Sequence, residues 1–402
     1  VFITDLDYNT IYVNEAFETE YGFMLEEILN KEIPVLADKY IAPNLKSDIT
    51  ESTLLKGWKG ELIIYGKEGN GFPTYMSTSS VKNDEGLAEA IVGICQDISE
   101  LKNIQETLKK RNNLLILLNN VIRFTNNSFN FNEAVRYTIN KVCEYTHWDI
   151  GHCFLLKDEY LESSGIWNDN IPDSYLLFQE ITEQKNLLKG KDIPGKTFET
   201  KRTSWLDINT QTDEKHFIRY KVTKELDIKT GIWVPVIMSD KTIGILEFFK
   251  KDLEKPDQEL LDCLDNIGFE VGRHYEKLEA IDNIKQSEKL LMHAQHIAKL
   301  GSWKGDMVKD EITWSDEMYL IYGLNKNNKS FRYQEYLKLI HPADLEYSTS
   351  VIKDAIENKR PFSYYHRIIV PTGDIKIIKA HGEVIFDING NVTGMFGTGH
   401  DV

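Results

Sequence analysis

The two ends of this 402-residue chain repeat each other. The segment 12–23 (YVNEAFETEYGF) aligns with 313–324 (TWSDEMYLIYGL) at an offset of 301 residues. Further along, three glycines and an aspartate of the first copy recur 304 residues later, and the pairs are Gly69/Gly373, Gly86/Gly390, Gly93/Gly397 and Asp97/Asp401. Internal repetition determines architecture before any single motif is weighed. We therefore expect two related domains, separated by a stretch long enough to form a third.

Each copy has the pattern of a small α+β domain. A short strand, a polar turn and a helix that ends at Tyr-Gly precede β-patterned segments separated by glycine turns. The turn sequences pair a small polar residue with glycine, which supplies the positive φ of tight turns. The predicted strands are 62–65, 74–81 and 90–95 in the first copy, and 365–370, 375–386 and 392–399 in the second. This pattern predicts an antiparallel sheet with helices packed on one face.

These features resemble PAS domains. The first copy has the YVNEAF block and the closing triplet Asp97-Ile98-Ser99, and the second adds the segments 294–303 (AQHIAKLGSW) and 340–344 (IHPAD). The second copy is similar to the PAS type common in bacterial and archaeal sensor histidine kinases. In that family the closing triplet leads from the last strand into a signalling helix, which implies relay roles for Asp97, Ser99 and Asp401. We expect PAS domains at 1–99, truncated at its start, and at 293–402, in a fragment whose output domain lies elsewhere.

The middle of the chain resembles a GAF domain of the histidine-kinase type. The segments 151–156 (GHCFLL), 193–198 (IPGKTF), 217–219 (FIR) and 242–249 (TIGILEFF) follow the order of that family's pattern. The resemblance covers 113–275. The overall fold class is therefore expected to be α+β, with three antiparallel sheets flanked by helices and joined by long amphipathic helices.

Two connectors, 100–124 and 264–292, show heptad spacing of apolar residues. The predicted dimer seam is Leu101, Ile104, Leu108, Leu115, Leu118, Ile122, Leu264, Ile267, Val271 and Leu278. So narrow an apolar stripe suits a parallel homodimer, although the same stripe could instead pack back on its own domain. In the second connector the heptad phase of the apolar residues changes after Ile281, which indicates either a heptad interruption or a helix break.

We find no catalytic motif in this chain. The segment Gly190–Thr197 matches the phosphate-binding pattern GxxxxGK[ST], but the polar stretch before it is not the buried strand that such a loop follows. Histidine-kinase phosphoacceptor, nucleotide-binding and GGDEF motifs are absent. The chain itself is expected not to be an enzyme, and its parent is expected to be an ATP-dependent protein histidine kinase.

A ligand is expected, but its identity stays open. Small-molecule sites are mostly apolar, and the pocket candidates are Trp58, Trp205, Trp233, Trp303 and Trp314, each of which could instead serve core packing. A haem held by one axial histidine is a further alternative, with candidates His216, His366 and His381. No metal-ligand cluster is present, and the flavin-adduct, bilin and cyclic-nucleotide signatures are missing.

Charge and hydropathy limit the partners. The net charge of −16 disfavours nucleic acid, and no apolar run is long enough to span a membrane. Four irregularly spaced cysteines indicate a reducing cytoplasm. We therefore predict a cytoplasmic, dimeric, signal-sensing input region of a two-component sensor histidine kinase. The alternatives are the input region of a diguanylate cyclase and a ligand-free dimerisation scaffold.

Overall fold

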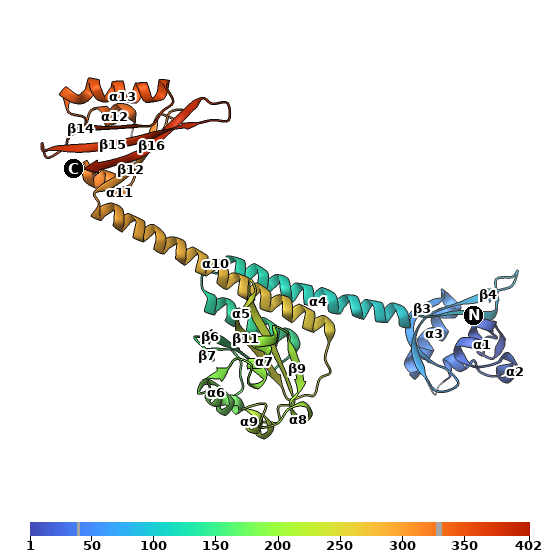
Figure 1. Cartoon of the computed structure of the whole chain (residues 1–402). Coiled ribbons are helices and arrows are strands. Elements are labelled where there is room, and N and C mark those ends of the chain that lie inside the picture. The colour runs from blue at the N-terminus through green and yellow to red at the C-terminus, as the bar shows by residue number, and fades with distance from the viewer. Residues whose placement is uncertain (38–40, 327–331) are drawn as a thin grey trace. The chain divides into compact units, whose positions relative to one another are not determined.

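The computed structural model describes residues 1–37, 41–326 and 332–402 (Figure 1). It contains three antiparallel sheets, each with its own helices, so the expected α+β class is confirmed. No helix in these described ranges combines the length and the apolar character needed to cross a membrane.

The N-terminal domain has a five-stranded sheet in the order β2-β1-β5-β4-β3. The strands are β1 (Phe2–Thr4), β2 (Thr10–Val13), β3 (Trp58–Tyr65), β4 (Gly71–Lys82) and β5 (Ala88–Asp97). The helices between β2 and β3 are α1 (Glu15–Tyr21), α2 (Leu25–Ile28), the 3-10 turn η1 (Pro34–Leu36) and α3 (Pro43–Leu55). The Asn14 side chain caps α1 by accepting from the Phe17 amide, and Gly22 ends the helix at a φ of 75°. The Tyr-Gly signal therefore marks a helix end, as predicted.

The C-terminal domain repeats this topology in the order β13-β12-β16-β15-β14. Its strands are β12 (Leu300–Asp306), β13 (Glu311–Trp314), β14 (Phe362–Ile369), β15 (Ile375–Phe386) and β16 (Val392–Asp401). Its helices are α11 (Asp316–Ile321), α12 (Tyr333–Leu337), the 3-10 turn η3 (Pro342–Asp344) and α13 (Leu345–Glu357). The strand register is also shared, because Phe2 pairs with Gly93 and Trp303 pairs with Gly397. The repeat found in the sequence is thus a repeat of fold.

The central domain has a six-stranded sheet in the order β8-β7-β6-β11-β10-β9. The strands are β6 (Ile150–Lys157), β7 (Tyr160–Trp167), β8 (Leu187–Leu188), β9 (Ser204–Asp207), β10 (Thr230–Met238) and β11 (Lys241–Lys250). The accompanying helices are α5 (Phe131–Thr146), α6 (Leu176–Glu183), α7 (Asp192–Thr200), α8 (Ile208–Gln211) and α9 (Tyr220–Glu225), with the 3-10 turn η2 (Asp173–Tyr175) before α6. The segments 151–156 and 242–249 of the GAF-like pattern lie in β6 and β11.

Two long helices, α4 (Ser99–Asn127) and α10 (Gln258–Ile297), account for the connectors. Helix α10 runs without interruption through Ile281, so the alternative of a helix break there is excluded. The first half of α4 exposes its apolar residues: Leu101, Ile104 and Leu108 are 52%, 49% and 59% exposed. The predicted seam residues in this first half of α4 are therefore available to a partner, and Leu115 of the second half is also 58% exposed.

The seam assignment on α10 is wrong for three residues. Leu264, Ile267 and Val271 are at most 1% exposed, because this part of α10 packs on the central domain. Gly268 allows that approach, since a Cβ there would lie 2.3 Å from the Pro235 carbonyl oxygen. The alternative that the stripe packs on its own domain therefore holds here.

The second half of α4 also buries a different side from the one that the heptad spacing predicts. Its buried residues are Leu114, Leu117, Val121 and Thr125, one position away from the predicted Leu115, Leu118 and Ile122. The change begins at the Arg111 interruption, where Lys110 and Arg111 form ion pairs with Asp257 and Glu259 at the start of α10. From this point α4 packs as part of the central domain rather than as a free stripe.

Candidate ligand-binding site

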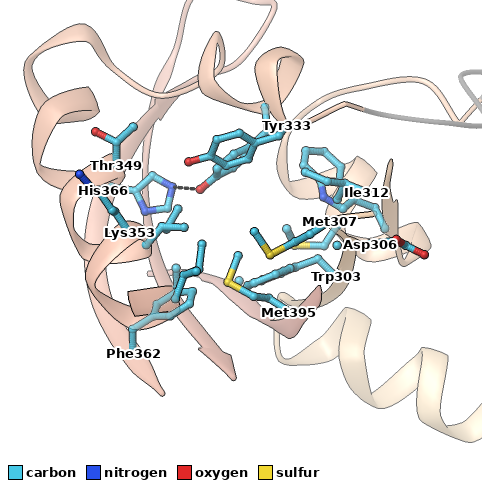
Figure 2. Close-up of a pocket in the computed structure, with 18 of the residues that line it drawn as sticks. Trp303, Asp306, Met307, Ile312, Tyr333, Thr349, Lys353, Phe362, His366 and Met395 are labelled. Atoms are coloured by element: carbon cyan, nitrogen blue, oxygen red, sulfur yellow. Dashed lines mark hydrogen bonds between the residues drawn. The ribbon is translucent and has the colours of Figure 1, made fainter. Parts of the chain in front are cut away.

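A cavity of about 520 Å³ lies inside the C-terminal domain (Figure 2). Its walls come from the sheet and from helices α11, α12 and α13. The apolar part of the lining includes Trp303, Ile312, Trp314, Met318, Ile352, Phe362, Ile378, Ala380 and Met395. This volume falls within the range of about 300–1,000 Å³ that is typical of small-molecule sites.

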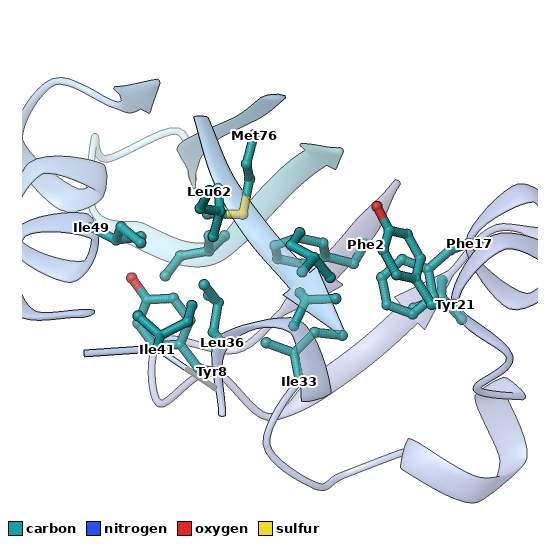
Figure 3. Close-up of a cluster of buried hydrophobic side chains, with 14 of the residues drawn as sticks. Phe2, Tyr8, Phe17, Tyr21, Ile33, Leu36, Ile41, Ile49, Leu62 and Met76 are labelled. Carbon is teal, nitrogen blue, oxygen red and sulfur yellow. The ribbon is translucent and has the colours of Figure 1, made fainter. Parts of the chain in front are cut away.

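The repeat explains how the cavity arises. The N-terminal domain fills the corresponding region with a packed cluster, shown in Figure 3, in which Met76 is fully buried. Met76 and Ala380 occupy the same register position, because they pair with Cys95 and Gly399 in equivalent strands. In the C-terminal copy, alanine replaces Met76 and glycine replaces Cys95, and both Ala380 and Gly399 line the cavity.

A second difference places a polar group in the cavity wall. Leu62 of the first copy corresponds to His366 of the second, since they pair with Thr74 and Ile378. His366 is 2% exposed, and its Nε2 lies 3.4 Å from the Tyr336 hydroxyl (Figure 2). Its Nδ1 is buried and has no hydrogen-bond partner among the described residues.

The polar groups of the buried lining are uncharged at neutral pH. Burial lowers the pKa of His366 to about 4, so its imidazole is neutral. Burial also raises the pKa of Tyr336 well above its ordinary value and raises the pKa of Tyr364, so both phenols keep their protons. The cavity can therefore hydrogen-bond a ligand, while its described buried lining supplies no charge.

The charged residues of the lining are not buried. Asp310, Glu311, Lys353 and Glu357 are exposed, and Asp306 is half-buried. The lining thus has four carboxylates and one ammonium group, and Lys353 pairs with Glu357 at 3.8 Å.

Two of the five tryptophan candidates line this cavity, Trp303 and Trp314. The other three are engaged elsewhere: Trp58 donates to Asp48, Trp233 to Glu247, and Trp205 to the Glu254 carbonyl oxygen. Trp233 is fully buried in the core of the central domain. Core packing therefore describes Trp58 and Trp233, whereas Trp205 is half-buried and lies edge-on to Trp148, with ring centroids 5.7 Å apart.

Of the three histidine candidates for an axial haem ligand, one lines the cavity and two are exposed. His366 lines the cavity, whereas the side chain of His381 is 52% exposed and lies 3.9 Å from Glu383. His216 is exposed and bonds Asp213 at 2.7 Å. Within the described ranges, no group of three histidine, cysteine or acidic side chains is placed to hold a metal ion.

Three of the four segments that resemble a GAF domain, 151–156, 217–219 and 242–249, meet in one buried polar network. Glu247 of β11 accepts two hydrogen bonds from Arg219, at 2.7 and 2.6 Å, and one from Trp233 at 3.0 Å. His152 lies 2.9 Å from the same carboxylate and 2.8 Å from the Ser163 hydroxyl. Four phenylalanine rings surround the Arg219 guanidinium, with centroids at 5.2–5.4 Å, and they are Phe154, Phe178, Phe217 and Phe249. The separate segments of the motif thus correspond to one structural unit.

The segment that matches a phosphate-binding pattern is folded on itself. The Gly190 amide donates to the Gly195 carbonyl oxygen at 2.9 Å, and the Thr197 hydroxyl is buried against Ser204 at 2.9 Å. A Cβ at Gly195 would lie 2.2 Å from the Leu188 carbonyl oxygen. These glycines serve close packing of α7 against β8.

The proposed relay residues lie at the ends of the last strands. Asp97 accepts from the Ser99 amide at 2.6 Å, at the start of α4. Asp401 pairs with Lys376 at 3.1 Å, and Lys376 also donates to the Ile321 carbonyl oxygen at 2.7 Å. Lys376 therefore connects the end of α11, which contributes Met318 to the cavity, with the last strand. Their role in signalling stays a prediction.

Sequence reasoning missed most of the cavity wall. Tyr333, Tyr336, Tyr364 and Met395 were not identified, because nothing in a single segment shows that a core position faces empty space. The available signal was the difference between the two copies at Met76/Ala380 and Leu62/His366.

Family models match both ends of the chain: one described as a PAS domain matches residues 1–100, and one described as a PAS fold matches residues 311–399. The nitrogen fixation regulatory protein of Klebsiella oxytoca is 26% identical over 123 residues, which cover 30% of this chain and 25% of that protein. A probable diguanylate cyclase of Escherichia coli (strain K12) is 24% identical over 133 residues, covering 31% of this chain and 12% of that protein. The chain thus spans a quarter or less of the length of these relatives.

Among solved structures, the GAF domain of a phosphoenolpyruvate-protein phosphotransferase from Coxiella burnetii is 14% identical. The match covers 43% of this chain and 98% of that domain, with a TM-score of 0.37. The two family matches fit the PAS domains expected at the two ends of the chain.

Proposed function

We propose that this chain is the sensory input region of a signalling protein and that its C-terminal PAS domain is the domain that binds the signal molecule. The observation that carries this proposal is the cavity beside Ala380, in a domain whose N-terminal copy is filled at the same place by Met76. A domain that only served as a scaffold would have no need of such a space, since filled interiors are more stable.

Ligand occupancy would reach the end of the domain through α11. Met318 and Tyr322 line the cavity, and Lys376 bonds both the Ile321 carbonyl oxygen and Asp401. A ligand that moves α11 changes the position of the lysine contact and hence the last strand. Coupling of this kind needs about 1–3 kcal/mol of differential binding.

The test of this proposal is native mass spectrometry, combined with an absorption spectrum, of the purified chain and of an Ala380→Met variant. We expect a small molecule to accompany the natural chain and to be absent from the variant, because methionine fills the cavity as Met76 does. Retention of the same molecule by a folded Ala380→Met variant would place the site elsewhere and overturn the proposal.

We propose a histidine kinase as the output of the complete protein. The support is the resemblance of the second PAS copy to those of sensor histidine kinases. A diguanylate cyclase is the second candidate, favoured by the similarity to the Escherichia coli relative. Incubation of the complete protein with labelled ATP or GTP separates the two: protein-bound phosphate supports the kinase, and formation of a cyclic dinucleotide supports the cyclase.

We further propose that the chain forms a parallel homodimer through the first half of α4. The support is the exposed stripe of Leu101, Ile104 and Leu108, which has the spacing of a coiled-coil seam. A cytoplasmic location is also part of this proposal. Its support is that Cys95, Cys143, Cys153 and Cys263 are all free thiols, the form that a reducing compartment maintains.

A further inference from the structure

We infer that the cavity of the C-terminal domain takes an uncharged, planar aromatic molecule that carries a hydrogen-bonding oxygen or nitrogen, and that it excludes anionic ligands. This inference rests on the proposed function of that cavity and specifies the chemical class of its ligand. It follows from the composition of the wall, from the state of its polar groups and from the charges of its lining.

The wall favours a flat aromatic body. Trp303 and Trp314 line it together with the rings of Phe362 and Tyr322, and Trp314 and Tyr322 are 4.6 Å apart between ring centroids. Aromatic walls favour aromatic ligands through offset stacking and edge contacts. Met318 and Met395 add polarizable thioethers, which make favourable contacts with ring edges.

The buried polar groups favour a ligand with one hydrogen-bonding group. His366 and Tyr336 form a polar pair in the wall, which also contains the hydroxyls of Tyr333, Tyr364 and Thr349, and Nδ1 of His366 has no partner in the described part of the chain. A neutral imidazole has one donor and one acceptor nitrogen. A buried polar group without a partner is unfavourable, so a ligand hydroxyl, carbonyl or ring nitrogen that bonds this pair gains affinity.

The charges disfavour an anionic ligand. Among the described residues of the wall, no arginine or lysine is buried, and the exposed Lys353 already pairs with Glu357 at 3.8 Å. A carboxylate or phosphate that entered would lose its hydration without gaining an opposite charge. The excess of carboxylates over ammonium groups in the lining would add to this cost.

The two copies supply matched variants for the test. His366→Leu introduces the residue of the N-terminal copy, which removes the polar group while it keeps a side chain of similar volume. Ala380→Met introduces Met76 of that copy and closes the space. Hydrogen exchange of β15 and β16 checks that each variant keeps the native fold.

The probes share one aromatic body and differ in a single substituent: 2-naphthol, naphthalene and 2-naphthoate, titrated into the whole chain at neutral pH by calorimetry. We expect 2-naphthol to bind about 5-fold or more tightly than naphthalene, which is the effect of about one hydrogen bond. 2-Naphthoate is expected to bind at least about 10-fold more weakly than 2-naphthol. His366→Leu should lose much of the preference for 2-naphthol over naphthalene, and Ala380→Met should bind neither.

Three results would overturn the inference, and only the third would also overturn the proposed function. If 2-naphthoate binds as tightly as 2-naphthol, the exclusion of anions is wrong. If His366→Leu keeps the full preference for 2-naphthol, the polar pair does not recognise the ligand. In both cases the proposed function stands as long as Ala380→Met abolishes binding. Unchanged binding of all three probes by Ala380→Met would overturn the inference and the proposed function together.

Discussion

At the scale of single residues, the central domain depends on a fully buried carboxylate. Burial alone would raise the pKa of Glu247, but Arg219 and His152 outweigh this effect and lower it to about 2. Breaking such a pair leaves a charge buried without a partner, which costs far more than the pair contributes. The network therefore demands that both partners be present.

We predict that Glu247→Gln lowers the free energy of unfolding of the central domain by about 3–5 kcal/mol, because Arg219 keeps its charge in the core. Hydrogen exchange of the amides of β11 measures this loss. The control is Glu162→Gln, which breaks the exposed ion pair with Lys157 at 3.2 Å and should cost less than about 1 kcal/mol. Equal protection of β11 in both variants would contradict the assigned role of Glu247.

The same network predicts the direction of pH dependence. The folded-state pKa of Glu247 is about 2, against an ordinary value of 4.5, so its contribution is complete above about pH 4.5 and is lost as the pH falls toward 2. Burial also lowers the pKa of His152 below its ordinary value of 6.5, so protonation of the unfolded chain begins to reduce stability below that pH. Urea unfolding at a series of pH values measures how the free energy of unfolding of the central domain falls. A stability of this domain that rises on acidification would contradict both assignments.

Met76 and Ala380 give a pair of predictions with opposite signs. Met76→Ala should lower the free energy of unfolding of the N-terminal domain by about 2–5 kcal/mol, because it leaves a cavity in a packed core. Ala380→Met should raise that of the C-terminal domain when it is empty, because it fills one. Hydrogen exchange resolves the two domains in one sample. Changes of the same sign would show that the two positions are not equivalent.

At the scale of elements, the packing of α10 on β10 depends on Gly268. Replacing glycine by alanine inside a helix normally stabilises it by about 1 kcal/mol. Gly268→Ala should do the reverse, because its Cβ would lie 2.3 Å from the Pro235 carbonyl oxygen. Urea unfolding of the central domain measures the effect. Ser287→Ala, at an exposed position of the same helix, is the control and should leave stability unchanged or slightly higher.

The elements were the most predictable part of the molecule. The strand at Ile375–Phe386 was predicted with its observed ends, since alternating residues and the flanking glycine turns are local signals. It was less predictable which partner the apolar side of each long helix packs against. The stripe at Leu264, Ile267 and Val271 has the same spacing whether it meets a second chain or its own sheet, and only tertiary packing decides between them.

The site was predicted only in part, for a different physical reason. Trp303 and Trp314 were found because large aromatic residues are frequent in pockets, but the same argument selected Trp58 and Trp233, which are packed in cores. A cavity is a property of volumes summed over several elements. It depends on a small residue such as Ala380, which carries no signal in the sequence on its own.

At the scale of the whole molecule, dimerisation is the prediction that a single variant can test. Ile104→Glu with Leu108→Glu places charges in the exposed stripe of α4, and we expect it to convert a micromolar dimer into a monomer in sedimentation equilibrium. Lys109→Glu with Asn113→Glu changes exposed positions outside the stripe and should leave the dimer intact. A monomeric natural chain would contradict the proposal outright.

The hollow C-terminal copy and its solid N-terminal counterpart also have a thermodynamic consequence. By mass action, a ligand present at about 100 times its dissociation constant adds about 2.7 kcal/mol to the domain that binds it and nothing to the other. Of two modules with one topology, only one should therefore melt at a temperature that tracks the concentration of the signal. The melting temperature of the other should not depend on the ligand. In each calorimetric scan the N-terminal domain therefore serves as an internal reference for the C-terminal one.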